Sequence, residues 1–356
     1  MSREKINILE MARPSVRELK PYASAKDEFK DFDRELIYLD ANENPYDNGL
    51  NRYPDPNQLA LKQKISKLKH IPVENILLGN GSDEVLDMIF RVFFEPGKDN
   101  IITNTPTFGM FKVLSSLNNI GCKQVSLTSD FQLDVPAIKK AIDGHTKAIF
   151  ICSPNNPTGN LMKADHIKVL LELGLLVVVD EAYIDFADIQ SWTQQLNRYN
   201  NLIVSQTFSK AFGLAGIRLG VCYADSRIID LLKKVKMPYN VNVLTQTTAL
   251  KYLENDKVRQ QQILEIVKNR EQLAKDLLKI GFVENIYPSD SNFILVKVDD
   301  ADKRYKQLIG KELVIRNRNK EPLCENCLRI TVGTSKENAI LMQSLLYLDE
   351  NKNMIS

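Results

Sequence analysis

The sequence predicts an α/β protein with a mostly parallel sheet, followed by a smaller α+β part. In the first two thirds of the chain, short apolar runs alternate with segments of helical spacing, the pattern of a parallel sheet flanked by helices. After Pro238 the residue pattern changes, and a long helix rich in Lys, Glu and Gln is expected from Val243 to Ile280. We therefore expect an N-terminal arm (1–40), a large domain (41–242) and a small C-terminal domain (243–356) that starts with the long helix.

The expected strands of the large domain are short runs rich in β-branched residues: Ile76–Leu78, Asn100–Thr103, Gln124–Leu127, Ala148–Cys152, Leu175–Asp180, Leu202–Ser205 and Gly220–Tyr223. Apolar stripes at helical spacing mark two of the helices: Leu61, Ile65 and Leu68, then Val85, Ile89 and Phe93. The small domain should add a last helix and three strands: Phe293–Val298, Leu313–Arg316 and Leu328–Val332. The arm is polar and expected to be irregular.

Composition narrows the class of protein. With 356 residues, 44% hydrophobic and 26% charged, the chain has the make-up of a globular enzyme. A net charge of +2 argues against a nucleic-acid partner. No apolar run reaches the roughly 20 residues of a membrane span, and the N-terminus lacks a signal-peptide core, so a cytoplasmic location is expected.

The five cysteines are odd in number and scattered, which favours reduced thiols. Cys324 and Cys327 form a C-x-x-C pair, but a zinc site needs two further ligands nearby. The chain has only three histidines, at positions 70, 145 and 166. We expect no metal site.

The strongest chemical signal is the segment 207–218, TFSKAFGLAGIR. Its lysine, Lys210, follows an expected buried strand and lies among small residues. Partial desolvation there would lower the lysine pKa and favour the nucleophilic amine. Arg218 follows, and a guanidinium can hold a phosphate through two hydrogen bonds. The alternative is a surface loop with ordinary solvated cations.

A second signal is the segment 177–183, VVVDEAY. Three β-branched residues predict a buried strand, so Asp180 emerges at its carboxyl end, where open α/β sheets bind ligands. A carboxylate in this place can pair with a protonated pyridine nitrogen, and Tyr183 could reach a phenolic oxygen on the same ring. The plainer alternative is a carboxylate that caps the next helix.

Two turns complete the set. The first, SPNNPTG at 153–159, follows a strand and could hold an asparagine amide against a ligand oxygen, although inert turns look similar. The second, GNGSDE at 79–84, leads into a helix whose N-terminal N–H groups could bind an anion. Alternatively, Ser82 caps this helix while Asp83 and Glu84 favour its dipole.

Together the four segments supply an amine, a partner for a ring nitrogen, hydrogen bonds to a ring oxygen and two phosphate-binding elements. Pyridoxal 5'-phosphate (PLP) is a cofactor that needs this whole set.

Nearly the whole chain also resembles the fold type I, aspartate-aminotransferase-like enzymes, and within their class II members the histidinol-phosphate aminotransferases. Further matching segments are LKPY (19–22), LDANENP (39–45), NRYPD (51–55) and CLRITVGT (327–334). The resemblance implies a large PLP-binding domain, an arm that packs with the small domain or the partner subunit, and a homodimer that shares its active sites.

Carried onto the matching positions, the resemblance implies that Lys210 binds PLP as a Schiff base and then moves the proton. Asp180 would pair with the pyridine nitrogen, while Tyr183 and Asn156 would hold the ring hydroxyl. The residues that would bind the cofactor phosphate are Ser82, Asp83, Ser209, Arg218 and, from the partner subunit, Tyr53. Phe108 would stack on the ring; tyrosine is common there, so a hydrogen bond that some relatives make is absent.

For the substrate, Arg329 matches the family's anion-binding arginine, and Asn156 contributes as well. Arg316 matches a second arginine that the histidinol-phosphate enzymes carry, and Arg318 competes for that role. Tyr22 matches an arm tyrosine near the substrate phosphate. Two arginines suit a site that accepts both glutamate and a phosphate ester. The alternative is a pair of surface cations.

The resemblance implies reversible amino transfer between L-histidinol phosphate and 2-oxoglutarate, which gives imidazole-acetol phosphate and L-glutamate in histidine biosynthesis. One rival is an aromatic or broad-specificity aminotransferase of the same fold. A second is a PLP-dependent decarboxylase of phosphorylated amino acids. A non-catalytic PLP-binding regulator is not expected, because the short arm leaves no room for a DNA-binding domain.

Overall fold

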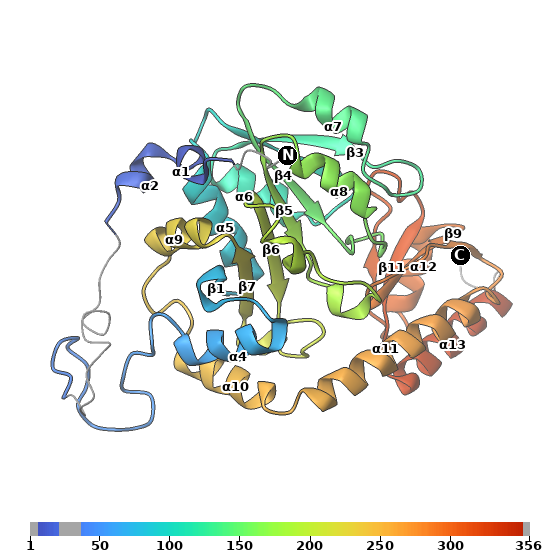
Figure 1. Cartoon of the computed structure of the whole chain (residues 1–356). Coiled ribbons are helices and arrows are strands. Elements are labelled where there is room, and N and C mark those ends of the chain that lie inside the picture. The colour runs from blue at the N-terminus through green and yellow to red at the C-terminus, as the bar shows by residue number, and fades with distance from the viewer. Residues whose placement is uncertain (1–5, 21–36, 352–356) are drawn as a thin grey trace.

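The computed structural model describes residues 6–20 and 37–351 and shows two β-sheets with helices around them (Figure 1). The larger sheet has seven strands in the order β1-β7-β6-β5-β4-β2-β3. Strands β2 to β6 run parallel, and β7 is antiparallel to both of its neighbours, β1 and β6. The predicted α/β class with a mostly parallel sheet is confirmed.

The seven strands fall on the seven predicted runs, with shifted ends: β1 Ile76–Asn80, β2 Asn100–Thr105, β3 Gly121–Ser126, β4 Thr146–Cys152, β5 Leu176–Asp180, β6 Leu202–Thr207 and β7 Leu219–Ala224. Their side chains alternate between two hydrophobic cores, one on each face of the sheet. In β5, Val177 and Val179 belong to one core and Val178 to the other. Burial on both faces explains why these strands read as continuous apolar runs.

Helices cover both faces of this sheet (Figure 1). They are α4 Leu59–Lys69, α5 Ser82–Phe93, α6 Met110–Leu117, α7 Val135–Ala141, α8 Ala164–Leu171 and α9 Ser226–Val235. Short 3-10 turns lie between them: η1 Val73–Asn75, η2 Ile184–Phe186, η3 Trp192–Gln195 and η4 Ala215–Ile217. The predicted apolar stripes lie on α4 and α5, and α5 is the most deeply buried of these helices.

The described part of the arm differs from its expected irregular form. It contains α1, Ile8–Met11, and α2, Pro14–Glu18. Ile8, Ala12 and Val16 are buried in the core that α5 and α9 share, so the arm packs here on the large-sheet body of its own chain. The three residues do not lie on one helix, because the chain is extended at Ala12, between α1 and α2.

The C-terminal part carries a four-stranded antiparallel sheet in the order β10-β11-β9-β8. Its strands are β8 Val283–Ile286, β9 Phe293–Val298, β10 Arg316–Asn317 and β11 Cys327–Thr331. The expected strand at Leu313–Arg316 is wrong except for its last residue, because Ile315 instead fills the core of this part from a loop. β8 was not predicted, since two of its four residues are polar.

Four helices accompany this sheet: α10 Val243–Leu253, α11 Asp256–Leu277, α12 Ala301–Ile309 and α13 Ser335–Glu350. The expected single helix from Val243 to Ile280 is wrong, because the chain leaves helical geometry at Asn255, which has φ −126° and ψ 75°. No helix among the described residues is both long and apolar enough to cross a membrane.

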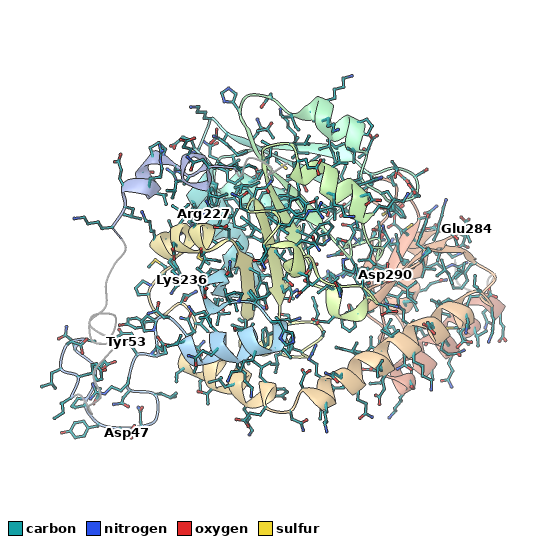
Figure 2. All side chains as sticks on the ribbon, viewed as in Figure 1. Asp47, Tyr53, Arg227, Lys236, Glu284 and Asp290 are labelled. Carbon is teal, nitrogen blue, oxygen red and sulfur yellow. The ribbon has the colours of Figure 1, made fainter. Side chains whose placement is uncertain are left out.

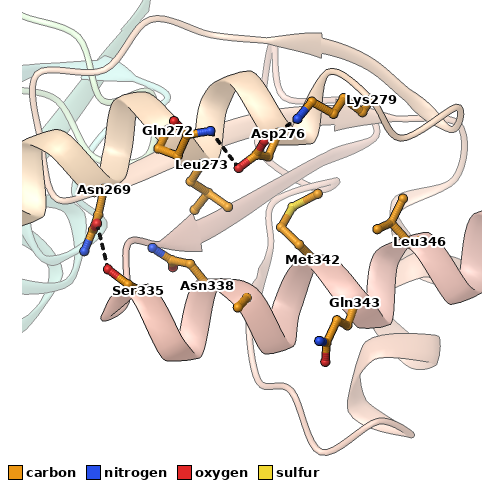
Figure 3. Close-up of a pocket in the computed structure, with 11 residues that line it drawn as sticks. Asn269, Gln272, Leu273, Asp276, Lys279, Ser335, Asn338, Met342, Gln343 and Leu346 are labelled. Atoms are coloured by element: carbon orange, nitrogen blue, oxygen red, sulfur yellow. Dashed lines mark hydrogen bonds and ion pairs between the residues drawn. The ribbon is translucent and has the colours of Figure 1, made fainter.

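The two faces of the small sheet have different neighbours. Leu328 and Ile330 of β11 pack with α11 and α13, whereas Cys327 belongs to a core of the large sheet. The small sheet therefore lies between its own helices and the large-sheet body. A cavity of about 400 Å³ opens between α11 and α13 (Figure 3), and none of the predicted site residues lines it.

One close approach fixes where α5 begins. β7 passes the start of this helix so closely that a Cβ atom on Gly220 would lie less than 3 Å from the backbone nitrogen of Ser82.

We predict that Gly220→Ala destabilises the fold by about 3 kcal/mol, because backbone rather than a flexible side chain must move. Gly216→Ala is the matched control, since its Cβ would meet open space. Urea unfolding of both variants checks this; equal midpoints would contradict it.

Candidate functional site

The predicted site segments meet at one edge of the large sheet. β1, β2, β4, β5 and β6 all end there, and β7, which runs the other way, begins there. The segments 79–84, 105–108, 153–159, 180–183 and 207–210 follow those strand ends, and Arg218 directly precedes β7. The carboxyl edge of an open α/β sheet is where such folds bind ligands.

Asp180 is the last residue of β5 and only 2% exposed. Its Oδ1 atom is buried and accepts no hydrogen bond from any described residue. Burial, followed by the negative charge of Asp83, raises the pKa of this carboxyl to about 7. A buried carboxylate is costly unless it is paired, so an N–H or cationic partner at Oδ1 would stabilise the ionised form.

Lys210 lies just after β6, where its carbonyl accepts a hydrogen bond from Gly213 N–H at 2.9 Å. Its Nζ atom is 5.7 Å from the centre of the Tyr183 ring. The side chain keeps access to solvent. Desolvation by the surrounding protein, and then the positive charge of Arg329, lower the pKa of Lys210, while Asp180 opposes the shift. A lowered pKa increases the fraction of neutral, nucleophilic amine.

A continuous set of contacts leads from the lysine to the small sheet. The ring of Tyr183, 7% exposed, packs edge to face on Phe293 at 5.1 Å between ring centres. The guanidinium carbon of Arg329 lies 5.1 Å from the centre of the same Phe293 ring, and its Nη1 donates a hydrogen bond to Asn156 Oδ1. Burial raises the pKa of Tyr183, so its phenol stays a hydrogen-bond donor at neutral pH.

The sequence predicts Phe293 only as the first residue of a strand and gives it no role in the site. The feature that could have indicated such a role is an aromatic residue directly after the polar turn 289–292, SDSN. The structure shows that it separates Tyr183 from Arg329 and contacts both.

The start of α5 and Arg218 together form a cradle for an anion. Gly81, which precedes the helix, has φ +82°, and a Cβ there would lie 2.6 Å from Arg218 Nη2. Arg218 Nη1 donates to Ser209 Oγ at 3.4 Å, and its Nη2 lies 4.0 Å from Asp83 Oδ2. The free N–H groups of the first helical turn, beginning at Ser82, add the anion-binding end of a helix.

The loops after β2 and β4 are tied together. Thr107 Oγ1 donates to Asn155 Oδ1 at 2.8 Å, and the Asn155 amide donates to Pro106 O at 3.0 Å. These bonds hold Phe108 and Asn156 at the same edge of the sheet. The Phe108 ring is half-buried and meets Phe111 edge to face at 5.7 Å.

Two predicted site residues are not brought into this set by the described chain. Tyr53 is 48% exposed and stacks on Tyr239 at 4.5 Å, in a loop that projects from the body (Figures 1 and 2). Tyr22 lies outside the described residues. The backbone places two arginines beside Arg329: Arg316 of β10 lies opposite Arg329 in the β10–β11 ladder, and Arg318, just after β10, donates its N–H to Cys327 O at 2.9 Å.

The raised pKa of Asp180 has a consequence for stability. In the ligand-free protein the folded carboxyl keeps its proton up to about pH 7, whereas the unfolded one loses it near pH 4. The contribution of this carboxyl to the free energy of unfolding is therefore fully present below about pH 4 and is lost as the pH rises to about 7.

We predict that Asp180→Asn removes this loss of stability with rising pH, on the order of 4 kcal/mol. Thermal unfolding from pH 4.5 to 8 measures it, and parallel curves for the two proteins would refute the shift.

Comparison with known proteins agrees with this geometry. The family model described as "Aminotransferase class I and II" matches residues 29–345. A histidinol-phosphate aminotransferase of Christiangramia forsetii is 57% identical over 344 residues, which are 96% of this chain and 98% of that protein. One of Flavobacterium johnsoniae is 54% identical, over 95% and 98%.

Solved structures of low sequence identity share the fold. The histidinol-phosphate aminotransferase of Clostridium acetobutylicum superposes with a TM-score of 0.78 at 24% identity, over 85% of this chain and 92% of that one. The L-threonine-O-3-phosphate decarboxylase of Porphyromonas gingivalis gives 0.72 at 22%, over 84% and 91%. The fold alone therefore does not separate amino transfer from decarboxylation. The family match over residues 29–345 does place the chain, which belongs to the class I and II aminotransferases.

Proposed function

We propose that this chain is a PLP-dependent histidinol-phosphate aminotransferase. It would move an amino group reversibly between L-histidinol phosphate and 2-oxoglutarate, giving imidazole-acetol phosphate and L-glutamate. The relatives that are 57% and 54% identical over nearly their whole length carry this name. The observation that carries the proposal is the gathering of Lys210, Asp180 and Arg218 at one sheet edge.

The residues present fit PLP. The unpaired, buried Oδ1 of Asp180 suits a protonated pyridine nitrogen, and a cationic ring nitrogen would in turn favour the ionised carboxylate. The cradle of Gly81, Ser209 and Arg218 at the start of α5 suits the phosphate. When bound, PLP supplies an aldehyde for the amine of Lys210 and a ring that accepts the electron pair of the substrate's Cα–H bond.

Each side chain then has a defined task. With PLP bound, Asp180 would keep the ring nitrogen protonated and the ring electron-withdrawing, and Tyr183 and Asn156 would donate hydrogen bonds to the phenolic oxygen. Lys210 would take the proton from the substrate Cα and return one on the cofactor side. Its lowered pKa suits this task, because a base needs its neutral form near the working pH. Phe108, at the same edge, is the residue to cover one face of the ring.

Substrate anions would be held by the small sheet. Arg329 is half-buried, and desolvation followed by the charges of Arg318 and Arg316 lowers its pKa to about 10, so it remains cationic at neutral pH. The hydrogen bond from Arg329 to Asn156 joins substrate recognition to the cofactor side of the site.

We further propose a homodimer, with Tyr53 acting at the partner's site. The support is the exposed position of Tyr53 in a projecting loop, together with Leu39, 88% exposed, and Tyr46, 82% exposed, on the same loop. An exposed apolar segment of this kind favours an interface.

We also propose the division into an arm (1–40), a large domain (41–242) and a small domain (243–356). The two separate sheets support it, with the interdomain helix broken into α10 and α11. The same absence of a spanning helix is compatible with the cytoplasmic location that we propose.

The central test is Lys210→Ala. The variant should fold and bind PLP through the remaining contacts, but turnover of L-histidinol phosphate with 2-oxoglutarate should fall below detection, because the amine that moves the proton is lost. Lys139→Ala, on the exposed surface of α7, is the control and should keep wild-type activity. Coupled glutamate formation measures both. Substantial turnover by Lys210→Ala would end the proposal.

A substrate panel separates the rivals. L-histidinol phosphate, L-phenylalanine and L-threonine O-3-phosphate are offered with 2-oxoglutarate, and glutamate and carbon dioxide are both measured. We expect glutamate formation with the first substrate at a kcat/KM at least about 100-fold above phenylalanine, since cationic arginines bind a phosphate dianion more strongly than a carboxylate. A preference for phenylalanine would favour the aromatic enzyme, and release of carbon dioxide would favour the decarboxylase.

Subunit mixing tests the shared site. Lys210→Ala and Tyr53→Ala homodimers should each be impaired, whereas hybrids contain one site with both native residues. After unfolding and refolding together in equal amounts, activity should rise toward about one quarter of wild type, because half of the dimers are hybrids with one working site. If the mixture is no more active than the mean of its parents, Tyr53 does not act across the interface.

A further inference from the structure

Three arginines lie on the same face of the small sheet. Arg316 of β10 is paired directly with Arg329 of β11, and the ladder continues with the bond from Arg318 N–H to Cys327 O. Side chains alternate along a strand, so Arg316 and Arg318 point to one face and Asn317 to the other. Asn317 Nδ2 donates to Asp302 Oδ1 of α12, at 2.5 Å. Arg316 and Arg318 therefore point away from α12.

That face is the one turned to the active site. Cys327, across from Arg318, is buried in a core of the large sheet, and Arg329 on the same face donates to Asn156. Directly opposed side chains are about 5 Å apart at Cβ and diagonal ones about 7–8 Å, within reach of arginine. Both Arg316 and Arg318 can therefore serve the anion that Arg329 binds.

Arg318 is the better placed of the two. Arg316 is exposed, whereas the Nε atom of Arg318 is buried and has no hydrogen-bond partner among the described residues. Its side chain is 25% exposed, and its Nη1 lies 3.6 Å from Glu321 Oε1, which orients the guanidinium without occupying Nε. The turn itself is fixed, because Glu321 N–H donates to Arg318 O at 2.9 Å.

Few negatively charged groups lie next to the three arginines in the described part of the chain. Glu321 is the acidic group bonded to Arg318, and Arg329 has a neutral amide, Asn156, as its partner. Of the two neighbouring arginines, Arg318 acts more strongly than Arg316 to lower the pKa of Arg329. Like charges held this close are unfavourable until an anion arrives. A phosphate dianion relieves more of this repulsion than a single carboxylate does.

We propose that Arg318 is a third anion-binding arginine of this site and a specificity residue that favours substrates with a phosphate monoester dianion over those whose anion is a single carboxylate. The proposal rests on the proposed function and names a determinant within it. It differs from the resemblance, which supplies Arg316 and Arg329 as the pair and leaves Arg318 only as a competitor for one role.

The test compares Arg318→Gln with Lys320→Gln, which removes the same charge from the exposed end of the same turn. In the PLP-loaded enzyme, Arg318→Gln should raise the KM for L-histidinol phosphate about tenfold or more and leave kcat within about twofold, because a charge-assisted contact to the phosphate is lost. The KM for L-phenylalanine, whose only anion is a single carboxylate, should rise much less. Arg318→Lys should recover part of the loss, and Lys320→Gln should behave as wild type.

A second readout is the competitive inhibition constant of inorganic phosphate, which should rise about tenfold in Arg318→Gln. Unchanged constants for both phosphate compounds would overturn the proposal. So would equal losses with L-phenylalanine accompanied by a lower Tm, since these would show a structural role. If the wild type does not use L-histidinol phosphate at all, the proposed function fails, while inhibition by inorganic phosphate still decides the role of Arg318.

Discussion

The site is organised by a carboxyl group that the fold buries without a full set of partners. Asp180 ends a strand whose side chains fill both cores, so its position is set by the packing of Val177, Val178 and Val179. One oxygen of the carboxyl has no hydrogen-bond partner in the described part of the chain. Such a group does not stabilise the sheet, because burial, followed by the charge of Asp83, raises its pKa to about 7, which costs the ionised form on the order of 4 kcal/mol. The cost makes physical sense when a cationic nitrogen occupies the position.

The topology supplies the other groups around that carboxyl. Parallel strands deliver their following loops to one edge, which places the segments of Asn156, Asp180 and Lys210 side by side. The reversed direction of β7 matters as much, because it returns the chain to the same edge and places Arg218 at its start. Two glycines permit the final approach: Gly81 leaves space for the Arg218 guanidinium, and Gly220 lets β7 pass the first turn of α5.

Much of this arrangement could be predicted from the sequence because its determinants are local. Val177–Val179 indicate a buried strand, and the alternation with helices predicts parallel neighbours, so Asp180 and Lys210 could be placed at one edge before any coordinates. The role of Phe293 could not, since it depends on the small sheet meeting the large one. The break at Asn255 was also missed: the flanking segments both have helical composition, and one residue outside helical geometry leaves little trace in a pattern.

The assignment of Arg316 and Arg318 from the sequence was limited in the same way, by contacts between distant parts of the chain. Spacing along the sequence favoured Arg316 and kept Arg318 as a competitor, while strand periodicity puts both residues on one face. What distinguishes them is burial, and burial depends on the turn from Arg318 to Cys327 and on contact with the large-sheet core. In the proposed function, proton transfer would therefore belong to the large sheet, through Lys210 and Asp180, while the choice of substrate anion would belong to β10, β11 and the turn between them. The two are joined by the bond from Arg329 to Asn156. A chain built in this way can change the charge it recognises by substitutions on two short strands, without disturbing the groups that move the proton.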